Sequence, residues 1–405
     1  MKVLEVLSRI YNNLDRRKLW ILWLANILWI VMLFSYVCCL ASYAAPQENS
    51  VPDLAPLDCK SALLMEAETG KVLYEQNADE SLPPASVTKV MTLLLTMEAI
   101  EKGTISLDQL LTASEHAASM GGTQVFLEVD EQMSVEDLLK SVIIASANDA
   151  AVVLAEAIAG SEESFVSMMN KRASELGMKN THFENTNGLD DSVTNHVTSA
   201  RDIAIMSREL IRHDKILEYS SIWMDTVRDG EFGLTNTNRL VRFYKGATGL
   251  KTGSTSKAKF CISATAKRDG MHLIAVIMGA PTRDVRNAEA AKLLDWGFAN
   301  YSLYTYESGD LGEIELLGGN TEKLPCMTNG ISLLVPKGTA GKVTAEVNMP
   351  KSVSAPVTEG EKIGRIVFSL EGDTIGEADI LSAAAFDRIT FLELLIFLFQ
   401  KFILC

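Results

Sequence analysis

The segment that most constrains this chain is Pro-Pro-Ala-Ser-Val-Thr-Lys, residues 83–89, because the uncharged apolar run 90–97 follows it directly. Such a run predicts a buried helix. Ser86 and Lys89 are three residues apart, so on a helix their side chains lie on one face, about 5–6 Å apart. A serine becomes a nucleophile when a base takes its proton, and a lysine can be that base when burial or a nearby cation lowers its pKa. The segment therefore predicts a serine–lysine pair at the start of a buried helix.

The Ser-x-x-Lys spacing alone is weak evidence, because such a pair on a helix usually lies on a solvated face. The same spacing recurs at Ser254 and Lys257. Only the first copy has prolines directly before it and an apolar run after it, which would bury the surroundings of its lysine. This context favours Ser86 as the nucleophile and Lys89 as the proton acceptor.

Two further motifs occur once each. Ser146-Ala147-Asn148 lies between two helical runs, where a short loop could project both polar side chains into a cleft, although alone it is equally typical of a helix cap. Lys251-Thr252-Gly253 begins a strand-like region, and alone it could be an exposed strand end beside a glycine bulge. The three motifs in this order are typical of the penicillin-recognising serine enzymes, and chance rarely produces all three.

Length, charge and cysteine content narrow the functional classes. A chain of 405 residues indicates more than one domain. The net charge of −15 and the lack of a basic stripe argue against nucleic-acid binding. The six cysteines form no CxxC pair and no Cys/His cluster with zinc spacing, so no metal or other cofactor is expected. A disulfide from Cys59 to Cys261 or Cys326 is one reading, and isolated buried thiols are the other.

The N-terminus predicts export. Residues 16–18 are Arg-Arg-Lys, and the almost entirely apolar run 19–45 follows them. Small residues near its end fit a signal-peptidase site after Ala44, although the run is long enough to remain as a transmembrane anchor. Residues 1–45 are thus expected to be a signal peptide or an N-terminal membrane anchor, and residues 46–58, with three prolines, a linker. Both readings place the body of the protein outside the cytoplasm.

The body, residues 59–302, has strand patterns at both ends and helical patterns between them. One hairpin is expected around Glu68-Thr69-Gly70, and a second around Arg268-Asp269-Gly270, after strands return at Gly249. Residues 284–298 predict a last helix. The expected fold is α/β, with an antiparallel sheet flanked by helices and an inserted helical subdomain.

The C-terminal part predicts two further pieces. Residues 303–382 contain short β-like runs separated by glycine and proline, which indicate a small all-β domain, an antiparallel sandwich without a catalytic cluster. Residues 386–405 predict a very apolar amphipathic helix with a narrow polar stripe. Such a helix is typical of attachment to a membrane surface, and docking on the protein's own core is the alternative.

With these motifs the chain resembles the low-molecular-mass penicillin-binding proteins, the serine-type D-Ala-D-Ala carboxypeptidases, over about residues 58–380. Further matching segments are Leu82-Pro83-Pro84-Ala85-Ser86, Ala147-Asn148-Asp149-Ala150, Asn180-Thr181-His182-Phe183, Asn187-Gly188-Leu189, Ser199-Ala200-Arg201-Asp202 and Leu293-Leu294-Asp295-Trp296-Gly297-Phe298. The β-rich segment resembles the accessory domain of this family, and the terminal helix resembles its membrane anchor. The resemblance implies an exported enzyme at the outer face of the cytoplasmic membrane or in the cell wall, with peptidoglycan peptides as substrate and β-lactams as inhibitors.

The resemblance also implies catalytic roles. Ser86 would attack the carbonyl between two D-alanines and form an acyl-enzyme, with Lys89 as the proton acceptor. Ser146 would relay a proton to the leaving amine. Lys251 would help to keep Lys89 neutral by charge repulsion.

The implied substrate-binding residues lie in the second and third motifs and directly after them. They are Asn148 for the substrate amide, Lys251 and Thr252 for the terminal carboxylate, Gly253 for a close approach of strand and substrate, and Ser254, whose backbone N–H would form the oxyanion hole with that of Ser86. Arg286 could add to the carboxylate site. Some relatives carry histidine at the position of Ser254, and this change keeps the backbone donor but removes a side-chain role in pH dependence.

Three other functions stay compatible with the motifs. A class A β-lactamase shares all three, but it uses a further glutamate to activate the deacylating water, and residues 182–189 match the carboxypeptidase pattern instead, so Glu184 is not expected to be that base. A DD-endopeptidase or transpeptidase differs only in its acceptor, which the motifs do not specify. A non-catalytic wall-binding protein is the third, and the intact motifs argue against it.

Overall fold

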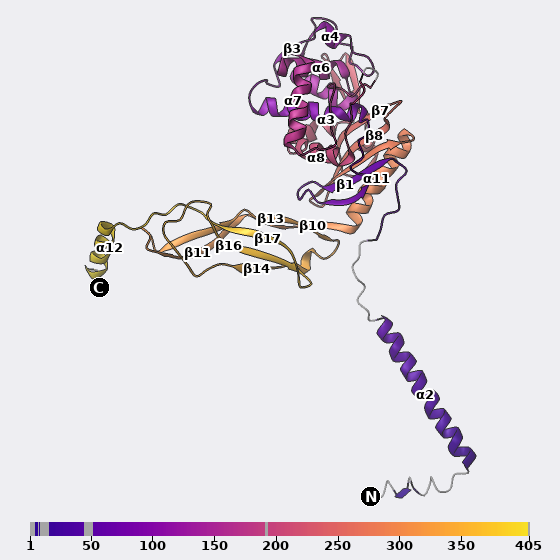
Figure 1. The fold of residues 1–405 in the computed structure, drawn as a ribbon, viewed down its shortest axis with the longest axis vertical. Coiled ribbons are helices and arrows are strands. Elements are labelled where there is room, and N and C mark those ends of the chain that lie inside the picture. The colour runs from indigo at the N-terminus through magenta and orange to yellow at the C-terminus, as the bar shows by residue number, and fades with distance from the viewer. Residues whose placement is uncertain (1–4, 7, 9–15, 44–51, 191–192, 404–405) are drawn as a thin grey trace. The chain divides into compact units, whose positions relative to one another are not determined.

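The structure is a computed structural model that describes residues 5–6, 8, 16–43, 52–190 and 193–403. The chain forms two units, Met1–Pro52 and Asp53–Cys405. In the first unit, helix α2 (Arg16–Tyr43) begins in the basic residues and contains most of the apolar run (Figure 1). Within the described ranges, no helix combines the length and the apolar character that crossing a membrane needs. The expected cleavage site after Ala44 lies outside the described residues.

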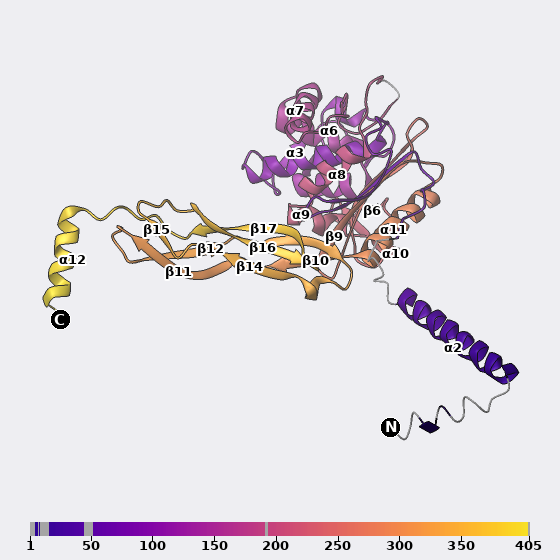
Figure 2. The same ribbon diagram turned by 60° about the horizontal axis from the view of Figure 1, so that its bottom comes forward.

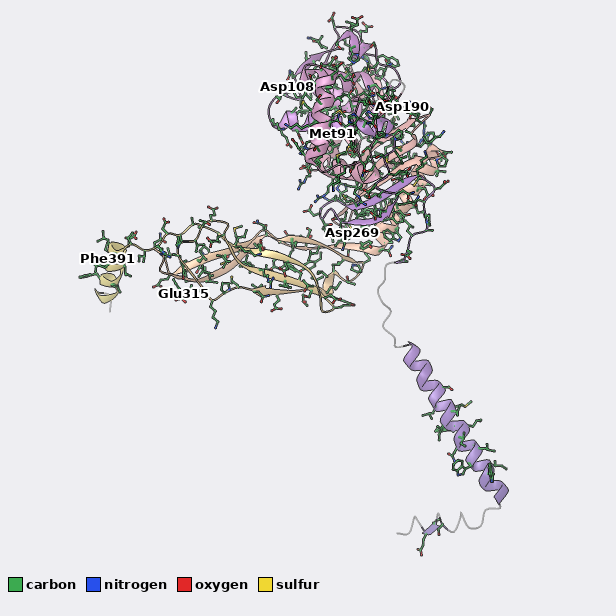
Figure 3. All side chains as sticks on the ribbon, in the orientation of Figure 1. Met91, Asp108, Asp190, Asp269, Glu315 and Phe391 are labelled. Atoms are coloured by element: carbon green, nitrogen blue, oxygen red, sulfur yellow. The ribbon has the colours of Figure 1, made fainter. Side chains whose placement is uncertain are left out.

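Five antiparallel strands form the central sheet of the second unit, in the order β2-β1-β9-β8-β7. The strands are β1 (Ser61–Glu66), β2 (Val72–Gln76), β7 (Ala247–Thr255), β8 (Lys259–Arg268) and β9 (Met271–Ala280). Both predicted hairpins are present, and Asp269 lies in the turn of the second (Figure 3). The sheet thus joins the beginning and the end of this domain, as the sequence predicts, and leaves β7 at one edge.

The helical region lies between β2 and β7 in the chain. Its longer elements are α3 (Lys89–Glu101), α5 (Val135–Lys140), α6 (Asn148–Ala159), α7 (Glu162–Glu175), α8 (Ala200–Leu210) and α9 (Asp214–Ser220). The short ones are the 3-10 turn η1 (Ala85–Thr88), β3 (Leu110–Thr112), α4 (Glu115–Ala118), β4 (Gln132–Ser134), the π-helical turn η2 (Ser141–Ala145), β5 (Met224–Val227), β6 (Phe232–Thr235) and α10 (Leu240–Phe243). Ser134 and Ser199 cap α5 and α8, because each hydroxyl accepts the N–H of the third residue after it.

Both faces of the central sheet are covered, which explains why its inner strands are apolar at nearly every position. Leu63 and Met65 of β1 pack into a core with the helical region, whereas Ala62 and Leu64 pack into a second core with helix α11 (Arg283–Asn300). Successive side chains of a strand point to opposite faces, so one strand serves both cores. Figures 1 and 2 show α11 on one side of the sheet and α3, α6 and α8 on the other.

The C-terminal β domain consists of a six-stranded sheet, in the order β14-β16-β17-β12-β11-β15, and a two-stranded sheet, β10-β13. Its elements are β10 (Tyr301–Tyr306), β11 (Gly309–Leu317), β12 (Lys323–Thr328), β13 (Ile331–Pro336), the 3-10 turn η3 (Ala340–Lys342), β14 (Thr344–Asn348), β15 (Ser352–Ser354), β16 (Lys362–Leu370) and β17 (Asp373–Ser382). Phe368 of the larger sheet contacts Tyr304 and Tyr306 of the smaller one, so the two sheets share one core.

One pairing in this domain differs from the antiparallel expectation. β15 runs parallel to β11, because the chain returns to that edge through β12, β13 and β14 rather than through a hairpin. The described cysteines Cys59, Cys261 and Cys326 are free thiols, which favours the second of the two readings of the sequence.

Helix α12 (Phe391–Ile403) ends the described chain. Its described large apolar side chains are exposed, among them Phe391 at 81% and Phe399 at 64% (Figure 3). The described side chains of α12 are therefore not buried in the protein's own core, which argues against the docking alternative.

Candidate active site

The predicted nucleophile lies on a tight turn before helix α3. Residues Ala85–Thr88 form η1, and the α-helix begins at Lys89. Ser86 therefore precedes the α-helix, whereas the sequence predicted that it lies in the first turn of that helix. Ala85 has a φ of +50°, a left-handed conformation that alanine rarely adopts. The turn nevertheless places Lys89 Nζ 3.0 Å from Ser86 Oγ, so the expected contact between the two side chains is present.

The surroundings of Lys89 direct its lone pair toward Ser86. Lys89 is fully buried, and its Nζ also lies 2.5 Å from Asn148 Oδ1 and 2.9 Å from the backbone oxygen of Asn187. Both of these oxygens can only accept, so a neutral amine donates its two N–H groups to them and accepts the O–H of Ser86. Burial lowers the pKa of Lys89 well below its ordinary value, and the charge of Lys251 lowers it further.

A second serine–lysine pair faces the first. Lys251 on β7 donates to Ser146 Oγ at 2.8 Å and to the backbone oxygen of Thr252 at 2.9 Å. Ser146 has a left-handed φ of +70° directly after the π-helical turn η2, and this wide turn aims its side chain at Lys251. Burial, and to a lesser extent the charge of Arg286, lower the pKa of Lys251 to about 7.

Asn148 connects Lys89 to the backbone of Gly121. Its Oδ1 accepts from Lys89, and its Nδ2 donates to the backbone oxygen of Gly121 at 2.6 Å. An amide nitrogen carries two protons, so this arrangement leaves one N–H for a substrate carbonyl. Asn148 therefore orients Lys89, a role that the sequence did not predict.

Gly253 on the edge strand β7 lies against the nucleophile turn. A Cβ built on this glycine would be 2.7 Å from the backbone nitrogen of Ser86, 2.8 Å from the backbone oxygen of Pro84 and 2.9 Å from the backbone nitrogen of Val87. The sequence suggested that Gly253 admits the substrate. The structure shows a different close contact, because the backbone of the nucleophile turn occupies the space that a side chain would need.

All eight predicted site residues lie in one region, and five of them line a cavity of about 180 Å³. The cavity is lined by Ser86, Thr123, Ser146, Thr237, Thr252, Gly253, Ser254, Arg283 and Arg286. Lys89 and Lys251 lie behind this surface, each bonded to a lining serine. Among the described residues, no group of three or more His, Cys, Asp or Glu side chains could hold a metal ion.

Three residues that line the cavity were not predicted from the sequence, and one of them, Thr237, bonds directly to a predicted site residue. Its hydroxyl accepts from Thr252 Oγ1 at 2.8 Å, so it extends the third motif by one hydroxyl group. The turn that carries it is held by Asn236 and Asn238, both almost fully buried. The pattern Asn-Thr-Asn could have predicted this turn, because asparagine side chains often form hydrogen bonds with nearby backbone groups in turns.

Glu184 does not face the nucleophile. Its Oε2 accepts the backbone N–H groups of Thr194 and Asn195, at 3.0 and 2.8 Å, and so braces its own loop. A carboxylate that is engaged in this way does not activate a water at Ser86. The geometry agrees with the expectation that Glu184 is not a β-lactamase-type base.

Comparisons with known proteins agree with this geometry. The family model described as D-alanyl-D-alanine carboxypeptidase matches residues 46–282, more than half of the chain, and the model described as penicillin-binding protein 5, C-terminal domain, matches residues 304–388. D-alanyl-D-alanine carboxypeptidase DacF from Bacillus subtilis is 40% identical over 379 residues, which cover 92% of this chain and 96% of that protein.

Two solved structures are similar as well. Penicillin binding protein 5 from Haemophilus influenzae has a TM-score of 0.74 at 32% identity, over 83% of this chain and all of that one. Penicillin-binding protein D2 from Listeria monocytogenes, in the ampicillin-bound form, has a TM-score of 0.56 at 34% identity, over 61% of this chain and 99% of that one. The chain therefore belongs to the D-alanyl-D-alanine carboxypeptidase family of low-molecular-mass penicillin-binding proteins, as its motifs and its α/β fold with an all-β C-terminal domain predict.

Proposed function

We propose that this protein is a serine-type carboxypeptidase that removes the terminal D-alanine from peptidoglycan stem peptides through an acyl-enzyme on Ser86. The observation that carries this proposal is the hydrogen bonding of Lys89. Its two other partners are pure acceptors, so its lone pair is left for the hydroxyl of Ser86. A buried neutral lysine beside a serine is the arrangement that activates a hydroxyl for attack.

Acylation includes two proton transfers, one from Ser86 to Lys89 and one from Ser146 to the leaving amine. Lys89 takes the proton of Ser86 as Oγ bonds to the carbonyl carbon of the penultimate D-alanine, and the carbonyl oxygen becomes an oxyanion. The C–N bond then breaks, and Ser146 gives its proton to the leaving amine while the neighbouring Lys251 restores it. After the D-alanine has left, Lys89 loses its proton to solvent and Lys251 regains one, so both lysines return to their starting protonation states. Water then attacks the ester while Lys89 takes one of its protons. Lys89 returns that proton to Ser86 Oγ as the ester bond breaks, and the shortened peptide is freed.

The terminal carboxylate of the substrate fits the end of the cavity where Arg286 lies. Lys251 and Arg286 are both buried cations, and the Arg286 guanidinium donates to a neutral partner, Asn287 Oδ1. A buried positive charge is stabilised by an anion, so a bound carboxylate relieves the burial of both cations. The hydroxyl groups of Thr252 and Thr237 lie at the same wall. This pocket selects peptides that end in a free carboxylate.

The same groups would accept a β-lactam. The relative from Listeria monocytogenes binds ampicillin, and it is 34% identical to this chain over the matching part. A β-lactam carries a carboxylate next to a strained amide, so Ser86 would open the ring and keep the acyl group as an ester.

We also propose that the enzyme is exported and attached to the membrane surface through α12. This placement is supported by the basic and apolar N-terminus and by the exposed apolar side chains of α12. In a protein that already lacks residues 1–45, deleting residues 386–405 should abolish binding to phospholipid vesicles while the rate of D-alanine release stays the same. Equal membrane binding with and without these residues would contradict the anchor.

The activity is tested by incubating the purified protein with a peptide that ends in D-Ala-D-Ala. Free D-alanine should appear with the wild type and disappear with Ser86→Ala. Equal release from both proteins would contradict the assignment of the nucleophile. Release that requires an amine acceptor, or cleavage of cross-linked peptides alone, would indicate the transpeptidase or endopeptidase alternative.

A further inference from the structure

A buried histidine that the proposed reaction does not use lies next to the nucleophile turn. His196 is 6% exposed, and its Nε2 is 2.7 Å from the hydroxyl oxygen of Thr88. On its other side, the backbone N–H of Glu184 donates to His196 Nδ1 at 3.0 Å. The hydroxyl of Thr88 in turn donates to the backbone oxygen of Ala85 at 2.9 Å. Together these contacts form an unbroken chain of three hydrogen bonds.

The direction of each hydrogen bond in this chain is fixed. Because Nδ1 of His196 accepts the N–H of Glu184, the ring proton is on Nε2, and Nε2–H donates to Thr88 Oγ1. The hydroxyl of Thr88 is then free to donate its own proton to the oxygen of Ala85. Burial keeps the pKa of His196 low, at about 4, so the ring is neutral at neutral pH. Each donor in the chain polarises the next one in the same direction.

The chain ends on the peptide unit that carries the nucleophile's own N–H. The C=O of Ala85 and the N–H of Ser86 belong to one planar peptide group and point in opposite directions. Fixing the oxygen of Ala85 therefore fixes the direction of the N–H of Ser86, which is one of the two expected oxyanion-hole donors. A hydrogen bond to the oxygen also makes the N–H of the same group a stronger donor.

The loop that carries His196 is fitted closely to this peptide group. Gly188 has a φ of +85°, and a Cβ at this position would be 1.9 Å from the oxygen of Ala85 and 2.8 Å from Thr88 Oγ1. The neighbouring Asn187 accepts from Lys89 through its backbone oxygen. Asn187 thus contacts the base, and Gly188 and His196 contact the nucleophile turn that carries this peptide group.

We propose that His196 is a positioning residue for the oxyanion hole, which acts through Thr88 and the Ala85–Ser86 peptide group. This inference rests on the proposed acylation of Ser86. Because His196 strengthens and aims a donor that acts on the developing negative charge, its loss should slow acylation without weakening the initial binding of substrate. We expect a roughly tenfold slower acylation, less than the 10²–10³-fold loss of rate on complete removal of an oxyanion-hole donor.

The test compares His196→Phe, His196→Gln and Thr88→Val with the wild type. Phe keeps the ring shape and removes both hydrogen bonds, whereas the amide of Gln can still donate to Thr88. His182→Phe is the matched control, because His182 lies in the same loop region with an exposed side chain and pairs with Val197 through its backbone alone. Single-turnover acylation by a labelled penicillin gives a rate constant per active molecule, so partial misfolding of a variant does not distort it.

The infrared stretching frequency of the acyl-enzyme ester gives a second measurement that a purely structural role would not change. Stronger hydrogen bonds to the ester oxygen lower this frequency. We expect His196→Phe and Thr88→Val to raise it and to slow acylation about tenfold, His196→Gln to restore most of both, and His182→Phe to change neither. The double variant should be no slower than either single variant, since both break the same chain.

An ester frequency in His196→Phe identical to that of the wild type would overturn the proposal, whether acylation is slow or normal. Failure of the proposed function gives a different result, because the wild type itself would then not be acylated at Ser86.

Discussion

Replacing Gly253 by alanine tests the fit between the edge strand and the nucleophile turn. The three nearest atoms to an added Cβ are backbone atoms of Pro84, Ser86 and Val87, at 2.7–2.9 Å. Backbone atoms cannot rotate away as the end of a flexible side chain can. The turn must therefore move from β7 by about 0.7 Å before the closest contact reaches an ordinary van der Waals distance.

A movement of this size should affect catalysis more than folding. A misplacement of about 1 Å can cost roughly 10²-fold in rate, so a shift of the turn that carries Ser86 should slow acylation by about 10–50-fold. Overpacking of this kind destabilises a protein by about 1–3 kcal/mol, which a domain with two large cores tolerates.

The assay is single-turnover acylation of Gly253→Ala by a labelled penicillin, together with urea unfolding. Gly233→Ala is the matched control, because Gly233 lies in strand β6, has no positive φ, and has no atom within 4 Å of the Cβ position. The control should acylate at the rate of the wild type. If Gly253→Ala acylated within twofold of the wild type, the fit between β7 and the turn would not control the position of Ser86.

Three further predictions follow from individual groups. Glu184→Gln should leave the lifetime of the penicilloyl-enzyme within about twofold of the wild type, since Glu184 braces its loop; a strongly prolonged lifetime in a deacylation assay would show that it activates water after all. Burial lowers the pKa of His196 to about 4, with a smaller effect of His182 in the same direction, while Glu184 and Asp190 oppose the shift, so the unfolded state binds more protons below pH 6.5. The contribution of His196 to stability should be complete above that pH and fall by about 3 kcal/mol as the pH drops to about 4. Burial also lowers the pKa of His272 to about 4, so urea unfolding of His196→Gln should show a shallower slope than the wild type, and an unchanged slope would contradict this assignment. Burial, and after it the charge of Arg286, lower the pKa of Lys251 to about 7, so kcat/KM for a peptide with a free carboxylate should decline as the pH rises through about 7. The decline should disappear in Lys251→Arg, because arginine stays charged. A decline that persists in this variant would show that another group titrates.

The three motifs were sufficient to predict the chemistry of the site because each is read within a few residues. The spacing of Ser86 and Lys89 holds on a 3-10 turn as well as on an α-helix, so the predicted contact is present although the turn type was wrong. The central sheet could be predicted for a similar reason, since its hairpins are local and its apolar strands are continuous.

Other features of the site depend on contacts between distant segments, and no local pattern of residues indicates them. His196 meets Thr88 across 108 residues, and Lys251 meets Ser146 across 105 residues. The π-helical turn before Ser146 reads as ordinary apolar helix, because its five residues are all compatible with an α-helix. The parallel pairing of β15 with β11 was missed because short strands do not reveal their partner.

The protonation state of Lys89 tests the central claim most directly. It can be measured by 15Nζ NMR on lysine-labelled protein, with the signal assigned by its loss in Lys89→Gln. The buried amine with two acceptor neighbours and one hydroxyl partner predicts a neutral Lys89 at pH 7 in the free enzyme. An ammonium signal for Lys89 that persists from pH 6 to pH 9 would contradict the proposal that this lysine takes the proton of Ser86.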